Sequence, residues 1–503
     1  MDAHNFKFHK STPAGANGLV MPKDLKTNAL SFFDTVSLAI AGSAPSYSLN
    51  ATTAALVGAV GLASPGALII GAIPMLGIAF AFKHLNRWRP DAGAVYAWVG
   101  RSVSPSLGFI CAWSFLVLSI AFMVTAAVPI GVATLDTIAP AYADRVFWVT
   151  LVGAAWFTVV AFLTIRGVRV AATFQKLMTG MEMVALIALF CGACVKFSSH
   201  PVNPITRDWF LPSGFPDFKT FMTGMLVAIF YYFGWDVSSN VAEETKGEHV
   251  TPGKSGVCGM VNIMVAMVAI TVTAQMCLSR EQISNNPAAV LTMLGKAVLP
   301  APWGSIAVLA VVLSTLGAIE TQLIQMSRTL FSMGRDRVLH EKFCEIHHTY
   351  ETPWLAGVFV LAFSLLTIWL SSYCHSVNKL MGTLIGTVSV LVSFYYGMTG
   401  LACGWYYRRT LHLDWENALM RGAFPVASGL FLLIAGGMQL PTLGIAASLV
   451  TCGAVAAGLI PMVFYRLKYK SEFYSSALES HRIQRDSAEQ TALDASGMMY
   501  ERG

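Results

Sequence analysis

The chain has 503 residues, of which 55% are hydrophobic and only 12% are charged, and its mean hydropathy is +0.60. Soluble domains usually carry about 25% charged residues, so this composition excludes an ordinary soluble protein and indicates an integral membrane protein. The net charge of +6 is modest and no run of Lys and Arg with interleaved aromatic residues occurs, which argues against nucleic-acid binding.

Twelve apolar segments predict an all-α protein with twelve transmembrane helices, because runs of about 20 residues favour helices over barrel strands. The first segment, residues 30–61, is too long for one uninterrupted crossing, and Gly42 and Pro45 favour a break within its AGSAPSYS stretch. The sixth segment, residues 218–242, is interrupted at Gly234. The other expected spans are residues 65–82, 105–135, 146–165, 171–195, 256–278, 303–333, 354–372, 380–406, 424–438 and 443–464.

The two breaks predict an inverted repeat. Four spans separate them, and paired interruptions at matching positions of two five-span halves are typical of transporters with a central binding site. Glycine is common in membrane helices, but both breaks also carry polar side chains, which favours the repeat. We expect repeats at residues 29–197 and 198–406, two peripheral helices at 407–466, and cytoplasmic ends at 1–28 and 467–503, since Lys and Arg concentrate in loops on one side.

Four carboxylates fall within the expected spans: Asp34, Glu182, Asp236 and Glu320. A carboxylate inside the membrane must take up a proton, pair with a cation or face water. We expect Glu182, Glu320 and Asp34 to couple transport to protons, although Asp34 has an equal alternative as a helix cap or a headgroup contact. For Asp236 the alternative is that it ends its span and reaches water.

The spans hold carboxylates but hardly any Lys or Arg, so their core suits an amine, a coupling cation or a proton. Backbone N–H groups at the breaks could bind a carboxylate, because half-helix N-termini carry partial positive charge. Core packing is an equal alternative for Tyr231. The expected substrate-binding residues are Gly42, Ser43, Ala44, Pro45, Ser46, Tyr47, Tyr231, Phe233, Gly234, Trp235 and Asp236.

Signatures of enzymes are absent from the sequence, which has no HExxH, no Walker A and no dinucleotide-binding fingerprint. We expect no catalytic residue, no metal site and no cofactor. Secondary transport is therefore the main interpretation of the sequence.

Three stretches resemble one family. YYFGWDVSSNVAEETK, residues 231–246, resembles the sixth-span signature of the amino acid–polyamine–organocation (APC) superfamily. Residues 89–113 are similar to its Pro-x-x-Gly-x-x-Tyr region, and residues 326–356 are similar to its connection between spans eight and nine. The resemblance implies the leucine-transporter fold and the uptake or exchange of amino acids, polyamines or related amines.

The chain departs from the family pattern at three places. His340 stands where the family usually has Pro, and the first break lacks the usual Gly-x-Gly. Glu182 stands where several amino acid transporters of the family carry Lys, so their Lys-based coupling does not carry over. Polyamines and other amines therefore compete with α-amino acids as expected substrates.

We expect a proton-coupled permease of the cell membrane that moves an amino acid, polyamine or other organic amine by alternating access. The alternatives are a monovalent cation transporter of the same fold, for potassium for instance, a substrate/product antiporter, and a non-transporting sensor. The expected partners are the amine or amino acid, the proton and the lipid bilayer, with a homodimer left open.

Overall fold

The structure is a computed structural model that describes residues 25–143, 145–286, 289–374 and 377–475. These residues are helical apart from turns and one isolated parallel bridge between Leu30 and Thr245. The expectation of an all-α protein is confirmed for them. The predictions for residues 1–24 and 476–503 lie outside the described part of the chain.

Ten helical segments within the described residues are long and apolar enough to cross a membrane. The first, Phe32–Trp88, contains three successive helices, and a shorter apolar helix, Phe218–Tyr231, lies in the predicted sixth span. Large apolar side chains are exposed on the outer helices, such as Val195 at 87% and Ile445 at 82%. A surface of this kind suits lipid rather than water, and the multi-pass membrane architecture is confirmed.

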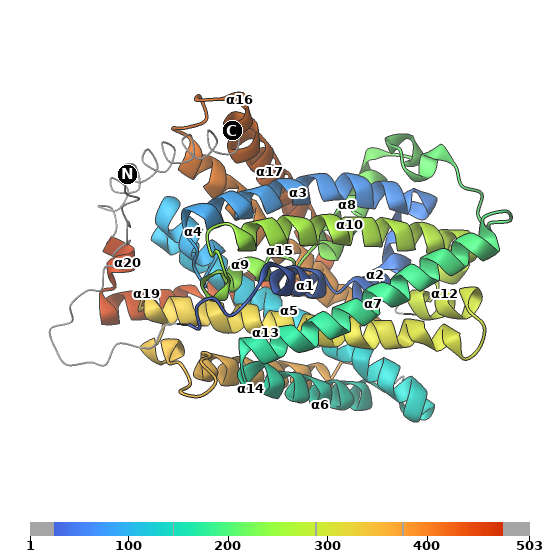
Figure 1. The fold of residues 1–503 in the computed structure, drawn as a ribbon, viewed down its shortest axis with the longest axis horizontal. Coiled ribbons are helices and arrows are strands. Elements are labelled where there is room, and N and C mark those ends of the chain that lie inside the picture. Colours follow the sequence, from blue (N-terminus) through green and yellow to red (C-terminus); the bar gives the residue numbers. More distant parts are fainter. Residues whose placement is uncertain (1–24, 144, 287–288, 375–376, 476–503) are drawn as a thin grey trace, which may run out of the picture.

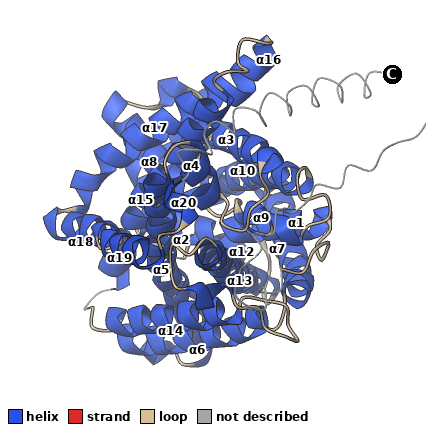
Figure 2. Ribbon diagram, turned by 90° about the vertical axis from the view of Figure 1, so that its left-hand side faces the viewer, coloured by secondary structure: helices blue, strands red, loops and turns tan. Residues whose placement is uncertain are grey.

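The long helices run side by side along the longest axis of the molecule (Figure 1), and Figure 2 views them nearly end-on. Helices α6 and α14 pack together at one edge of the bundle, while α16 and α17 lie at the opposite edge. The long helices are α3 (Ser64–Trp88), α5 (Pro105–Ile138), α6 (Val146–Ile165), α7 (Val168–Phe197), α10 (Thr251–Cys277), α13 (Ile306–Arg335), α14 (Trp354–Ser371), α15 (Val377–Tyr407) and α17 (Phe424–Gln439). The shorter helices are α4 (Val95–Ser102), α11 (Arg280–Ser284), α12 (Val290–Val298), α16 (Trp415–Asn417), α18 (Ile445–Ala456), α19 (Leu459–Tyr469) and α20 (Glu472–Ser475).

The first expected span is two helices, α1 (Phe32–Ser43) and α2 (Pro45–Val60), which meet at Ala44. Ala44 has a left-handed backbone with φ 45°, which stops α1. Pro45 then occupies the first turn of α2, where its missing N–H costs no hydrogen bond. The predicted break in this span is confirmed.

The sixth expected span is also interrupted. Helix α8 (Phe218–Tyr231) begins at the capping residue Asp217, whose side chain accepts a hydrogen bond from the N–H of Thr220 at 2.7 Å. The chain then leaves the helical path, and Gly234 takes a φ of 101°, a region that L side chains rarely adopt. A short helix, α9 (Val237–Asn240), follows. The interruption predicted at Gly234 is confirmed.

Candidate functional site

The two breaks touch each other through Gly42 and Gly234. A Cβ atom added to Gly42 would lie 2.1 Å from the carbonyl oxygen of Gly234. A Cβ atom added to Gly234 would lie 2.2 Å from the carbonyl oxygen of Gly42. Either contact is far shorter than van der Waals distance, so both positions require glycine. The interrupted middles of two helices far apart in sequence therefore form one locus.

Asp236 is the carboxylate of this locus. Its side chain is fully buried, which contradicts the alternative that it reaches water at the end of a span. Its Oδ1 accepts a 2.8 Å hydrogen bond from the hydroxyl of Tyr396 on α15, and that hydroxyl accepts a 3.3 Å bond from the N–H of Gly234. The side chain of Gln325 on α13 lies near the same carboxyl group. Tyr396 thus fixes both the carboxylate and the irregular backbone.

Sequence reasoning missed Tyr396. Its signal was a pair of tyrosines, Tyr395 and Tyr396, in the middle of an otherwise apolar span. A phenol hydroxyl buried in a membrane helix usually needs a partner, so such a residue is a candidate to meet a buried carboxylate.

Four buried polar atoms at the breaks have no hydrogen-bond partner among the described residues: Ser43 Oγ, Ser46 Oγ, Trp235 Nε1 and Asp236 Oδ2. Leaving such a group unpaired costs roughly 1–3 kcal/mol, and more when it is charged. Each of these residues is at most 2% exposed. The locus thus offers one acceptor and three other hydrogen-bonding groups to a small polar ligand, and all four groups are shielded from solvent.

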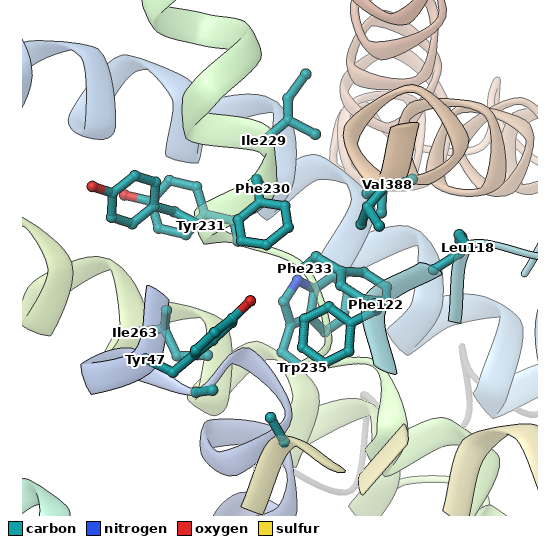
Figure 3. Packing of buried hydrophobic residues seen from close by; sticks show 14 of the residues in the cluster. Tyr47, Leu118, Phe122, Ile229, Phe230, Tyr231, Phe233, Trp235, Ile263 and Val388 are labelled. Carbon is teal, nitrogen blue, oxygen red and sulfur yellow. The ribbon is translucent and has the colours of Figure 1, made fainter. Parts of the chain in front are cut away.

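An aromatic cluster surrounds this polar locus. The ring of Trp235 packs edge-on against Phe82 at 5.1 Å between centroids and lies 5.6 Å from Tyr396. Figure 3 shows Phe122 beside Phe233 and Trp235, and the Phe122 and Phe233 centroids are 5.8 Å apart. Phe82 and Phe122, which the sequence did not single out, complete this wall.

The two predicted tyrosines already have protein partners. The hydroxyl of Tyr47 donates to the carbonyl oxygen of Thr125 at 3.1 Å, and that of Tyr231 donates to Thr53 Oγ1 at 2.9 Å. Both side chains are fully buried. Their hydroxyls brace α2 against neighbouring helices, which favours the packing interpretation of Tyr231.

Glu182 lies at the first break. It projects from α7, is 1% exposed, and its Oε1 accepts a 2.8 Å hydrogen bond from the backbone N–H of Ser46 in the first turn of α2. The next N–H, that of Tyr47, donates to Ser314 Oγ of α13 at 3.2 Å. Glu182 and Ser314 therefore cap the half-helix α2 from two other helices.

The remaining two carboxylates differ in their surroundings. Glu320 on α13 is 4% exposed and makes no hydrogen bond or ion pair within the part of the chain that the structure describes. Asp34 accepts hydrogen bonds from the N–H and hydroxyl of Ser31 in a capping box and pairs with Lys176 at 2.6 Å. The capping interpretation of Asp34 is confirmed.

A network of ion pairs ties the far end of the second break to α13. Arg328, which is 1% exposed, binds Glu244 through its Nε and Nη2 atoms at 3.0 and 3.1 Å. Arg335 binds both carboxylate oxygens of Glu243 at 2.8 Å. From the sequence we expected a core almost without cations and did not predict that Arg328 is buried. Its bidentate ion pair with Glu244 makes this burial possible.

The same segment holds the start of α1, because the N–H groups of Ala29 and Leu30 donate to the carbonyl oxygen of Glu244 at 2.7 and 3.0 Å. The first and sixth expected spans are therefore joined at this end as well as at Gly42 and Gly234.

Asp91 belongs to this network from the connection between α3 and α4. It lies 3.3 Å from Arg335 and accepts a 2.7 Å hydrogen bond from Ser332 Oγ. Burial acts to raise the pKa of Asp91, but the guanidinium groups of Arg335, Arg89 and Arg101 outweigh it and hold the pKa below its usual range. Asp91 thus stays ionised and bonded at neutral pH.

Comparison with known proteins decides the family. The model of the amino acid permease family matches residues 30–474, which include both breaks and the ion-pair network. The chain belongs to the amino acid permease family. This permease is a membrane transporter and not an enzyme.

Its curated relatives are transporters of several solutes. The low-affinity putrescine importer PlaP of Escherichia coli K12 is 26% identical over 66% of this chain and 71% of its own length. The methylthioribose transporter of Bacillus subtilis is 24% identical over 65% of this chain and 73% of its own length. The L-lysine transport protein of Corynebacterium glutamicum is 24% identical over 67% of this chain and 68% of its own length. The permease is thus placed among amino acid and polyamine transporters.

Proposed function

We propose that this permease is a proton-coupled transporter of an amino acid or organic amine that works by alternating access. The observation that carries the proposal is the contact of two interrupted helices at Gly42 and Gly234, with the buried carboxylate of Asp236 beside it. Discontinuous helices that meet near mid-membrane are typical of substrate sites in secondary transporters. The putrescine and lysine transporters among the relatives are consistent with an amine as the cargo.

The proposal includes twelve spans arranged as a five-plus-five inverted repeat, with two peripheral helices and both termini in the cytoplasm. The concentration of Lys and Arg in alternate loops supports this orientation. Under it, the ion pairs of Glu243 and Glu244 lie on the cytoplasmic side. The ion pair of Arg328 with Glu244 is shielded from solvent there, since the two residues are 1% and 0% exposed.

We assign substrate contact to nine residues of the two breaks: Gly42, Ser43, Ala44, Pro45, Ser46, Phe233, Gly234, Trp235 and Asp236. Tyr47 and Tyr231 have less support in this role, because their hydroxyls already bond to other parts of the protein. Asp236 would hold the amine through Oδ2, and Ser43 and Trp235 would supply hydrogen bonds. The breaks are closed to solvent, as an intermediate of alternating access requires.

Proton coupling is assigned to Glu182 and Glu320, because neither has a cation partner among the described residues while both are buried. A carboxyl group in such surroundings can gain and lose a proton as the cavity opens to either side. Asp34 has less support in this role, because Lys176 already balances its charge.

Uptake into proteoliposomes with and without an imposed pH gradient tests the proposal. We expect gradient-driven accumulation of an amine or amino acid by the wild-type protein. Glu182→Gln should abolish accumulation but spare exchange, because exchange needs no net proton movement. Accumulation that is indifferent to the gradient for every solute tested would contradict proton coupling.

Two alternatives give different results in the same vesicles. A substrate/product antiporter would require a second solute inside the vesicles and would ignore the pH gradient. A monovalent cation transporter would take up a rubidium tracer in the absence of any amine.

A further inference from the structure

We propose that Glu182 makes this permease selective for organic amines that lack a carboxylate, and selects against the corresponding α-amino acids. The inference rests on the proposed function and names the substrate class of the same site. It follows from the hydrogen bonds at the N-terminus of α2, the place where a transporter with a broken first span could hold the carboxylate of an amino acid.

The N–H groups at this helix start are accounted for one by one. Ala44 donates back to the carbonyl oxygen of Ala41 at 3.0 Å, and Pro45 has no N–H. Ser46 donates to Glu182, Tyr47 donates to Ser314 Oγ, and Ser48 donates to the carbonyl oxygen of Ala44 at 2.8 Å. The first turn of α2 therefore has no N–H left for a ligand.

Glu182 occupies this position with the same chemical group that an amino acid would bring. A helix N-terminus carries roughly half a positive charge, which one carboxylate satisfies. While Glu182 is ionised, a second carboxylate beside it would face like-charge repulsion in a buried site, where water screens the charges poorly. The protein's own side chain thus takes the place of a ligand carboxylate.

Two basic side chains near these elements are already neutralised. Arg328 on α13 is held by both oxygens of Glu244, and Lys176 on α7 pairs with Asp34 at 2.6 Å. Neither is free to neutralise a carboxylate brought by a substrate.

The charged and partially charged groups that remain at the breaks attract a cation. Helices α1 and α8 both end here, and helix C-termini carry partial negative charge. Asp236 adds a carboxylate whose Oδ2 has no hydrogen-bond partner among the described residues. The locus thus favours an ammonium group and disfavours a carboxylate.

Matched ligand pairs that differ only by the α-carboxylate test this inference: putrescine with ornithine, cadaverine with lysine, and agmatine with arginine. Each is added as a competitor of radiolabelled putrescine uptake in proteoliposomes, and its binding to the purified full-length protein is measured by calorimetry. We expect the amine of each pair to bind and compete at least tenfold better. Equal or better binding of the amino acids would overturn the inference while leaving the proposed function intact. If no member of any pair binds but a neutral amino acid such as alanine does, the inference is overturned as well, whereas the proposed function fails only if no amine or amino acid binds or is transported.

A variant series tests whether Glu182 is the cause. Glu182→Ala exposes the N–H of Ser46 and should shift the amine-to-amino-acid affinity ratio at least tenfold toward the amino acid. Glu182→Gln keeps a hydrogen-bond acceptor without the charge, so it should shift the affinity ratio in the same direction but by a smaller factor. This variant also provides the test if Glu182→Ala does not fold. Met181→Ala, at the neighbouring position with its side chain 43% exposed, should leave the ratio unchanged. An unchanged ratio in both Glu182 variants would show that the carboxylate does not set the selectivity.

Discussion

The hydroxyl of Tyr396 bridges Asp236 and Gly234, because it donates to the carboxylate of one and accepts from the backbone N–H of the other. One side chain on α15 therefore holds both the charged group and the irregular backbone of the second break. Because this contact links α15 to the interrupted span, removing the hydroxyl of Tyr396 should have a measurable effect on ligand binding.

Tyr396→Phe should weaken amine binding about tenfold, because a hydrogen bond to a charged group is worth about 1.5–3 kcal/mol and about 1.4 kcal/mol corresponds to a factor of ten. Calorimetry on the purified protein measures the change. Tyr395→Phe is the matched control, since it removes the neighbouring buried hydroxyl, which donates no hydrogen bond to Asp236 in the described structure. Equal losses in both variants would indicate a general packing defect and count against a specific bridge.

Gly42→Ala and Gly234→Ala should each abolish transport and lower thermal stability, because the added Cβ would lie about 2 Å from a backbone carbonyl oxygen. Gly234→Ala carries the additional strain of a φ of 101°. Gly180→Ala is the control, since a Cβ there has no atom within 4 Å. Wild-type uptake by either of the first two variants would show that the close approach is dispensable.

Glu244→Gln should destabilise the protein by about 3–5 kcal/mol, because it leaves the guanidinium of Arg328 buried without its charge partner. Replacing both residues, as in Arg328→Met with Glu244→Leu, should recover much of this loss, since apolar groups need no partner. Thermal unfolding in detergent is the measurement. Lys26→Ala, which breaks a partly exposed pair with Glu351, should cost at most about 1 kcal/mol. A double variant no more stable than Glu244→Gln would contradict this account of the buried pair.

Asp91→Asn should lower the unfolding temperature at pH 7, with a difference that shrinks as the pH falls below about 4. The pKa of Asp91 is lower in the folded state than in the unfolded chain, so its ionised form stabilises the fold above the unfolded pKa of about 3.9. That contribution is lost as the pH falls through the lowered folded value. Unfolding curves from pH 7 to about pH 2, the lowered pKa of Asp91, measure it, with the exposed Glu416→Gln as control. A difference independent of pH would show that Asp91 acts through packing alone.

The sequence by itself determined the membrane class, the helical architecture and the two breaks. Each of these depends on local chemistry: the length of apolar runs, the missing N–H of Pro45, and the freedom of Gly234 to adopt a positive φ. It also located the buried carboxylates, because an ionisable residue in an apolar run stands out without any knowledge of its partners.

Only the tertiary structure decided what those residues contact. Glu182 and Ser46 are 136 positions apart, and Tyr396 and Asp236 are 160 apart, so no periodicity or local motif pairs them. Hydrogen bonds at such separations depend on how helices pack, which in turn depends on the side chains of every neighbouring helix. For this reason the sequence could present Glu182 as a lone carboxylate, whereas the fold shows it as the cap of a broken helix.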